Sequence, residues 1–472
     1  MSQKEITEAQ QLELDELFAR ARKAQATIAT YDQARVDRLA QCVAWAAGNA
    51  PTFARLGRMG VEESGVGDAE GRIGKRHKVL GVLRDALRQR SVGLIEEDPV
   101  RGLARYAKPA GVIASLIPMT NPELTPIVTS IYALKARDCV IFSPHPRTKK
   151  TTNEVVGLMR AGLRAIGEPE DFLLCLSSPN VAQVGRLMST ADLVMATGGP
   201  AMVRAAYSSG RPAYGVGAGN STMVIDETAD VVEAARNTRM SKTSDFGSGC
   251  SADGNLIVHA SIFEAMVAQL QKEGGYLVAP EQRAALAAAM WDEKGARRVA
   301  TVARSAPDMA EAAGFAVPAG TKFLMVMGDG IGRDHPFSKE KLTTVLALYK
   351  YEGEFENALT MMEAIYEVGG KGHSCGIYSF DDEHIHRLAL RAPVTRIMVR
   401  QPQSKANAGS FNNGMPMTSS LGCGTWGGNI VSENVALKHY LNNTWVARPI
   451  PEDKPPEAEL FGEFYDSAKN TL

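Results

Sequence analysis

Cys250 stands in the segment DFGSGCSADG, surrounded by glycines and small polar residues. A nucleophilic cysteine needs access to its substrate, a stabilised thiolate and N–H donors for the oxyanion that its attack creates. Gly247 and Gly249 allow the backbone to approach a substrate oxygen closely. Cys375 in GHSCGIYSF and Cys423 in LGCGTWGG lie in stretches of similar composition. The local sequence therefore leaves two interpretations of Cys250 open: a nucleophile, or a cysteine in a turn.

The other cysteines fit packing roles. Cys42 falls in a helical pattern, and Cys139 and Cys175 fall in apolar runs typical of strands. No two of the six cysteines form a CxxC pair, so a zinc site and a disulfide framework have little support. We expect reduced thiols and no metal.

The elements that must position Cys250 follow from the hydrophobic pattern. Residues 3–95 carry helical periodicity almost throughout, and from about residue 106 short β-branched runs alternate with helical stretches. The predicted strands are 111–118, 139–143, 172–177, 192–198 and 221–226, followed in a second block by 255–259, 322–330 and 343–351. Such alternation predicts open parallel sheets with helices on both faces. Cys250 falls at the junction of the two blocks.

One strand end fits a phosphate site. In TGGPAMVRAAY (197–207) a strand ends, two glycines turn the chain, and a helix begins with Pro200 in its first turn. Helix N-termini at the carboxyl ends of parallel strands offer free N–H groups to a pyrophosphate. Strand-to-helix turns with glycines are common, so this segment alone leaves cofactor binding open. The later GVGAGN (215–220) is a weaker candidate, because a strand-like segment follows it.

Composition excludes several classes of protein. The chain has 472 residues, a net charge of −1 and a sequence pI of about 6.7, so no general basic field attracts nucleic acid or anionic lipid. No stretch has the roughly 18 to 20 apolar residues needed to cross a bilayer, and the N-terminus lacks a signal-peptide layout. We expect a multidomain cytoplasmic protein that binds neither nucleic acid nor membrane.

A set of ordered motifs resembles the aldehyde dehydrogenase superfamily, and within it the coenzyme A (CoA)-acylating branch. The motifs are IPMTNP (117–122), DLVMATGG (192–199), RPAYGVGAGN (211–220), SGCSADG (248–254), KEKLTTVLAL (339–348), KGHSCGIYS (371–379) and SFNNGMPMTSSLGCGTWGGN (410–429). The resemblance implies an α/β fold of two doubly wound parallel-sheet domains with a small oligomerisation arm. The implied ranges are a cofactor-binding domain at 1–228 with the arm near 94–109, a catalytic domain at 229–425 that carries Cys250, and a return to the cofactor domain with an oligomerisation tail at 426–472.

The resemblance implies that Cys250 attacks an aldehyde carbonyl and that its backbone N–H and an amide side chain hold the oxyanion. Asn121 is the amide that we favour, although the P-W-N-F-P pattern of hydrolytic relatives would align Thr120 with the catalytic amide. We place Thr120 among the cofactor residues. His373 is the predicted acid or base, because acylating relatives have G-H-T-A-G-I-H-S where this chain has GHSCGIYS. The alternative is an imidazole that only orders its loop.

The resemblance also implies the fate of the thioester left on Cys250. Hydrolytic relatives carry a glutamate base in an E-L-G-G-K motif, and Gly215 occupies that position here. Transfer to CoA is then expected, in a reversible reaction that yields acyl-CoA and NAD(P)H. The motifs are most similar to those of succinate-semialdehyde and sulfoacetaldehyde dehydrogenases, and we favour sulfoacetaldehyde. A hydrolytic dehydrogenase and a non-catalytic nucleotide-binding relative are the alternatives.

The implied cofactor site draws on several segments. It comprises Thr197, Gly198 and Gly199 at the pyrophosphate, Ser143, Pro144 and His145 near the adenosine, Glu340 at a ribose hydroxyl, and Gly217, for which no part of the cofactor is specified. A lysine of NAD-using relatives aligns with Ser143, and its absence leaves room for a 2′-phosphate that Arg147 or Lys149 can pair with. NADP and NAD both stay open. The segment 94–109 and the tail from about 440 are similar to strands that join subunits, which implies a homodimer or homotetramer.

Overall fold

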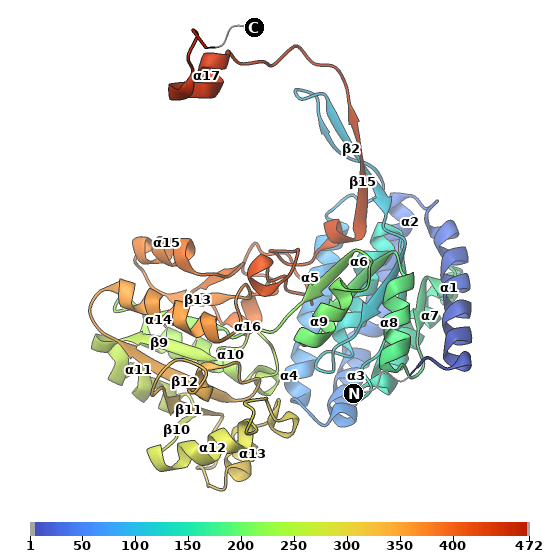
Figure 1. Ribbon diagram of the computed structural model, residues 1–472. Coiled ribbons are helices and arrows are strands. Elements are labelled where there is room, and N and C mark those ends of the chain that lie inside the picture. The colour runs from blue at the N-terminus through green and yellow to red at the C-terminus, as the bar shows by residue number, and fades with distance from the viewer. Residues whose placement is uncertain (1–4, 470–472) are drawn as a thin grey trace.

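The computed structural model describes residues 5–469, and Figure 1 shows two α/β bodies with an arm that projects from one of them. The N-terminal helices in this range are α1 (Glu8–Ile28), α2 (Gln33–Gly48), α3 (Ala50–Ser64), α4 (Ala69–Gly74) and α5 (Arg76–Leu87). The side chains of Thr7, Asp32 and Asn49 cap the first three by accepting backbone N–H groups. The helical periodicity of the N-terminal segment is confirmed from Glu8 onward.

The first sheet has the strand order β5-β4-β3-β6-β7, and its strands are parallel. Its elements are β3 (Val112–Leu116), α6 (Leu124–Ala136), β4 (Cys139–Ser143), α7 (Lys149–Ala165), β5 (Leu173–Cys175), α8 (Val181–Thr190), β6 (Leu193–Thr197), α9 (Pro200–Tyr207) and β7 (Ala213–Val216). The chain builds outward from β3 to β5 and then crosses to β6 on the other side of β3. Open sheets bind ligands at such a switch point, beyond the carboxyl ends of the strands.

The second sheet is also parallel, with the order β10-β11-β12-β9-β8-β13-β14. Its strands are β8 (Thr222–Ile225), β9 (Asn255–His259), β10 (Gly275–Leu277), β11 (Phe323–Met327), β12 (Val345–Tyr351), β13 (Cys375–Tyr378) and β14 (Ile397–Val399). Its helices are α10 (Val231–Lys242), α11 (Ala260–Lys272), α12 (Arg283–Met290), α13 (Ala306–Ala312), α14 (Phe355–Val368), α15 (Asp382–Arg391) and α16 (Gln403–Ala406). The segments that enter β8, β9, β12 and β13 meet at the amino edge of this sheet. They carry Asn220, Cys250, Glu340 and His373.

The strand pairing and the buried core show where the chain passes from one sheet to the other. β8 pairs with β9 and β13, so the two sheets divide between β7 and β8, before the predicted border at 228. Buried residues from Met417 to Tyr440 belong to the core of the first sheet, so the chain returns there before 426. Periodicity identifies a strand, but it does not say which sheet the strand joins. The domain ranges themselves stay a prediction.

An antiparallel sheet forms the arm. β1 (Gly93–Asp98), β2 (Leu103–Pro109) and β15 (Leu441–Ala447) pair in the order β1-β2-β15. The chain then runs on to α17 (Glu457–Phe461), which Figure 1 shows far from both bodies. The two predicted arm segments are therefore strands of one sheet. Their role in joining subunits stays a prediction.

Two strands that were not predicted lie in glycine-containing motifs. β7 lies within RPAYGVGAGN, and β13 lies within KGHSCGIYS. Cys375 is the buried first residue of β13, so it does not share the loop environment of Cys250. In the described range, none of the helices combines the length and the apolar character needed to span a membrane.

Candidate active site

The chain just before Cys250 bends through three consecutive left-handed residues. Asp245, Phe246 and Gly247 have φ values of 49°, 49° and 67°. This conformation costs about 1–2 kcal/mol for each residue that has a side chain. Glycine at the third position avoids that cost. The first two positions need support from their surroundings.

Asp245 supplies that support through a buried charge network. Its carboxylate accepts hydrogen bonds from Arg72 Nε at 2.8 Å, Lys75 Nζ at 2.6 Å and Ser248 Oγ at 2.6 Å. Arg72 is fully buried and also pairs with the buried Glu123 at 3.2 Å. α4 and the residue that follows it therefore fix the loop that presents Cys250.

Cys250 contacts His373 directly, with 2.9 Å between Sγ and Nε2. The other ring nitrogen, Nδ1, lies 2.8 Å from Ser374 Oγ. That hydroxyl in turn lies 3.1 Å from Ser221 Oγ and accepts from Asn407 Nδ2 at 3.2 Å. His373 is fully buried. The structure thus brings two of the three predicted catalytic residues together and fixes the orientation of the imidazole.

Burial keeps both members of this pair neutral. It raises the pKa of the Cys250 thiol to about 12, and it lowers the pKa of His373 to about 3. The nearby Glu340 also raises the Cys250 pKa, whereas Lys78 and Arg396 lower it. At neutral pH both groups are uncharged, and in the tautomer with its proton on Nδ1 the thiol donates to Nε2 while Nδ1–H donates to Ser374.

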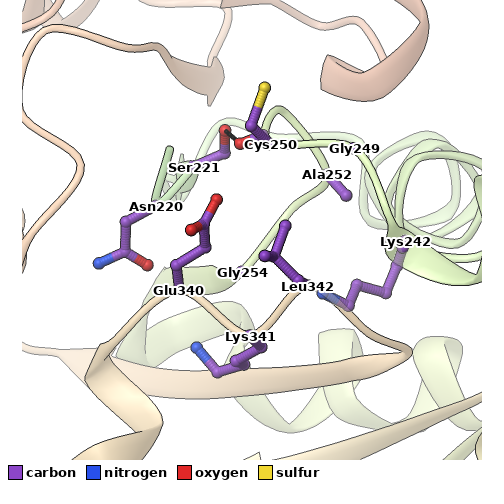
Figure 2. A pocket seen from close by; sticks show the side chains of 11 residues that line it. Asn220, Ser221, Lys242, Gly249, Cys250, Ala252, Gly254, Glu340, Lys341 and Leu342 are labelled. Atoms are coloured by element: carbon purple, nitrogen blue, oxygen red, sulfur yellow. Dashed lines mark hydrogen bonds between the residues drawn. The ribbon is translucent and has the colours of Figure 1, made fainter. Parts of the chain in front are cut away.

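Figure 2 shows the Cys250 sulfur pointing away from Glu340, Lys341 and Leu342, which line a small cavity on the opposite side of the loop. Glu340 Oε1 accepts from the Gly219 N–H at 3.0 Å, and burial raises the pKa of its carboxyl to about 7. The sulfur is therefore free to face a substrate, while Glu340 lies behind the loop.

Asn121, the third predicted catalytic residue, bonds elsewhere. Its Oδ1 accepts from Lys75 Nζ at 2.7 Å, and its Nδ2 donates to Thr120 Oγ1 at 3.4 Å. Among residues 5–469 no hydrogen bond joins Asn121 to Cys250. Lys75 links the two segments, because it also binds Asp245 next to the nucleophile loop. The role of Asn121 stays a prediction.

The predicted pyrophosphate and adenosine residues gather at the carboxyl edge of the first sheet. Ser143 ends β4, with Pro144 and His145 directly after it, and Thr197 ends β6, with Gly198 and Gly199 leading into α9. No side chain caps α9, and the space beside Gly199 is open. Uncapped N–H groups next to open space fit the pyrophosphate of a dinucleotide. Thr197 Oγ1 lies 3.1 Å from Ser420 Oγ.

The two cations predicted for a 2′-phosphate lie after β4. The Arg147 guanidinium donates to the backbone oxygen of Ser64, and Lys149 Nζ donates to Ser178 Oγ at 3.2 Å. Neither forms an ion pair within the described residues. Gly217 lies elsewhere, in a cleft of about 660 Å³ that Ala218, Cys423 and Trp426 also line, a volume typical of ligand sites.

Gly215, where hydrolytic relatives carry glutamate, has no room for a side chain. A Cβ there would lie 2.9 Å from both Tyr207 Cε2 and Val203 Cγ1. The Tyr207 hydroxyl donates to the Gly215 oxygen at 3.1 Å and accepts from the Ile430 N–H at 3.1 Å. The Tyr207 ring and the Val203 side chain therefore occupy the space into which a side chain at position 215 would extend.

The sequence did not reveal several of these neighbours. Tyr207 and Asp245 lie within motifs that were considered, but nothing local marks their contacts. Lys75 and Lys78 have the three-residue spacing of one helix face, and Lys405 lies far along the chain. Such spacing shows a shared face, but it does not show that the face meets Cys250.

Two parallel α/β sheets, with a cysteine and a histidine in contact at the amino edge of the second, define an α/β enzyme of the kind that works through a thiol. The chain belongs to the aldehyde dehydrogenase family, whose family model matches residues 2–415.

Relatives of known name are similar over nearly their full length. A sulfoacetaldehyde dehydrogenase of Acholeplasma is 42% identical, with 95% of this chain and 94% of that protein covered. An acylating sulfoacetaldehyde dehydrogenase of Bilophila wadsworthia is 39% identical, covering 97% and 98%. An acetylating succinate-semialdehyde dehydrogenase of Clostridium kluyveri is 36% identical, covering 95% and 98%.

Solved structures agree with this placement. An acetylating aldehyde dehydrogenase of Geobacillus thermoglucosidasius superposes with a TM-score of 0.91 at 33% identity, covering 95% of this chain and 99% of that one. A propionaldehyde dehydrogenase of Rhodopseudomonas palustris with bound propionyl-CoA has a TM-score of 0.81 at 26% identity, covering 92% and 94%. An engineered glycolyl-CoA reductase with bound NADP⁺ has a TM-score of 0.81 at 25% identity, covering 92% and 96%.

Proposed function

We propose that this protein oxidises a short anionic aldehyde, sulfoacetaldehyde first, with CoA and NAD(P)⁺ to acyl-CoA and NAD(P)H, in a reversible reaction. The observation that carries the proposal is the contact between Cys250 and His373. At Gly215, in addition, a side chain such as a hydrolytic base would meet Tyr207 and Val203. The names of the relatives support the same reaction. Succinate semialdehyde is the second candidate substrate, because one of those relatives is named for it.

In the first step His373 Nε2 takes the Cys250 thiol proton while Sγ bonds to the aldehyde carbon. The carbonyl electron pair moves to oxygen, and the oxyanion is held by the Cys250 N–H and by the amide of Asn121. Asn121 reaches this position if its hydrogen bond to Lys75 is exchanged. The oxidised dinucleotide, when bound by Thr197 to Gly199, Ser143 to His145, Arg147, Gly217 and Glu340, supplies a hydride acceptor. The acyl group is then a thioester on Cys250.

In the second step His373 first releases its proton to solvent, which accounts for the proton that the overall reaction yields. The neutral imidazole then takes the proton of the CoA thiol as the CoA sulfur bonds to the thioester carbon. When the tetrahedral adduct collapses, the Cys250 sulfur leaves and recovers the proton from His373. Exchange between two thioesters is nearly balanced in free energy, so the reaction runs in both directions.

The test is NAD(P)H formation with and without CoA, for neutral, carboxylated and sulfonated short aldehydes and with both cofactors. We expect formation only with CoA. Rapid turnover without CoA would overturn the acylating proposal in favour of hydrolysis. Cys250→Ala should abolish turnover, and unchanged activity in that variant would point to a protein that only binds nucleotide.

We also propose that the arm joins subunits into a homodimer or homotetramer. Trp445 on β15 and the α17 side chains Leu460 and Phe461 are more than half exposed, and apolar groups on a projecting arm favour burial against another chain. Sedimentation velocity would test this, and a monomer at micromolar concentration would contradict it. Six free cysteines fit a reducing compartment such as the cytoplasm.

A further inference from the structure

Three lysines from two distant segments gather beside the nucleophile loop. Lys75 and Lys78 lie at the start of α5, three residues apart and therefore on one face. Lys405, from α16, donates to Ser244 Oγ at 2.8 Å, and Ser244 directly precedes Asp245, the residue that Lys75 binds. Both contacts are made to the segment that leads into Cys250.

The three lysines differ in the hydrogen-bond partners of their ammonium groups. Lys75 Nζ is held by Asp245 at 2.6 Å and by Asn121 Oδ1 at 2.7 Å. Within the part of the chain that the structure describes, the Lys405 ammonium group bonds only to the Ser244 hydroxyl. Lys78 is half-buried, and within residues 5–469 its ammonium group has no hydrogen bond or ion pair.

The acidic groups nearby are already engaged. Asp245 pairs with both Arg72 and Lys75, and Asp68 caps α4 by accepting from the Gly71 N–H at 2.7 Å. Glu123 pairs with Arg72. Among the described residues, no carboxylate therefore forms an ion pair with Lys78 or Lys405, whereas Lys75 is paired with Asp245.

Lys78 is close enough to Cys250 for their charges to interact. Its ammonium group lowers the pKa of the Cys250 thiol. Burial, followed by the charges of Lys75 and Lys405, lowers the pKa of Lys78 itself to about 8. An anion in front of Lys78 would relieve this repulsion, because the protonated lysine would gain an opposite charge.

We propose that Lys78, assisted by Lys405, binds the anionic group of the aldehyde and so selects substrates that carry a sulfonate or carboxylate near the carbonyl. A sulfonate or carboxylate oxygen accepts an N–H of Lys78 while the carbonyl carbon of the same small molecule meets Cys250 Sγ. Charge-assisted hydrogen bonds shielded from water are the strong ones. This inference rests on the proposed function, because it names the specificity site of that reaction.

The test compares sulfoacetaldehyde, succinate semialdehyde and the neutral propanal at saturating CoA and cofactor. Lys78→Met should lower kcat/KM for sulfoacetaldehyde about 10- to 100-fold, the range for a lost hydrogen bond to a charged group, mainly through KM. Propanal should change by less than about threefold, since the bond is absent with that substrate. Lys78→Arg should restore most of the loss, and Lys405→Met should act in the same direction. The exposed Lys272→Met, on α11, removes the same charge elsewhere and should change neither substrate.

The outcomes separate the two proposals. Equal losses on sulfoacetaldehyde and propanal, or no loss on either, would overturn the anion site while leaving the acylating reaction in place. If Lys78→Met does not fold, Lys405→Met and Lys78→Arg decide by the same comparison. If the wild-type protein makes acyl-CoA from none of the aldehydes, the proposed function fails and the anion site fails with it. A larger effect on succinate semialdehyde than on sulfoacetaldehyde would support the site and make the carboxylate its ligand.

Discussion

Gly215→Glu will not create a hydrolytic enzyme, because the new side chain has nowhere to go. A Cβ at this position lies 2.9 Å from two carbons, Tyr207 Cε2 and Val203 Cγ1, whereas ordinary contacts are 3.4–4 Å. Tyr207 is held by hydrogen bonds to the Gly215 backbone and to the Ile430 N–H, so the ring has little freedom to withdraw. Overpacking of this kind costs about 1–3 kcal/mol.

Gly215→Ala isolates that cost from the effect of a carboxylate. We expect its free energy of unfolding to fall by about 1–3 kcal/mol, with a Tm lower by several degrees. Tyr207→Ala removes the nearest ring, so Gly215→Ala should cost less than half as much in that background. Gly217→Ala is a stability control, because a Cβ there meets no atom within 4 Å.

The assay combines thermal unfolding at fixed protein concentration with NAD(P)H formation in the absence of CoA. A Gly215→Ala protein with the Tm of the wild type would refute the steric argument. A Gly215→Glu protein that oxidised aldehydes without CoA would refute the argument that Tyr207 prevents a glutamate at position 215 from acting as a hydrolytic base. Gly215→Glu with Tyr207→Ala tests the second point again, since it supplies both the carboxylate and the room.

Three further predictions concern the buried charges. Arg72→Met should lower the free energy of unfolding by about 3–5 kcal/mol, because it leaves Asp245 short of a buried partner; urea unfolding checks this, and a change below about 1 kcal/mol would contradict it. Burial raises the Asp253 pKa to about 7, so the contribution of Asp253 to wild-type stability falls as the pH rises from about 4 through 7. Asp253→Asn should therefore be more stable than the wild type at pH 8 and lose that advantage at pH 4. Equal urea midpoints of the two proteins at pH 8 would contradict this. The rate of Cys250 alkylation by iodoacetamide should rise about tenfold per pH unit from pH 7 to 10, with no inflection near 6.5 because His373 stays neutral. Peptide mass spectrometry follows this rate. A rate that does not change with pH would mean that the pair is a thiolate and an imidazolium.

The sequence predicted most strands of both sheets, because their apolar runs are local features. β4 and β9 begin and end at the predicted residues. β7 and β13, like β10 and β14, were not predicted; β7 and β13 each contain a glycine within four residues. Glycine weakens a strand signal, and in these two cases pairing with neighbouring strands supplies what the local sequence lacks.

The pairing of Cys250 with His373 follows from topology that local sequence cannot supply. β9 and β13 both pair with β8 in parallel, so the segments that enter them meet at one edge of the sheet. The two residues are separated by 123 positions. Motif resemblance predicted that both residues are catalytic, and their contact depends on which strands lie on either side of β8.

Gly215 and Lys78 show what a residue type alone leaves undetermined about a site. A sequence shows that glutamate is missing at 215, yet a missing base alone does not prevent another water-activating group from taking its place. The Tyr207 ring at that position makes the absence consequential, because it occupies the volume that such a group would need. Lys78 is the converse case: its residue type is visible in the sequence, but its meaning comes from the acidic side chains around it, which already have other partners. Residue types thus specify what chemistry a site can do, and the neighbours, which only the fold brings together, decide what it does.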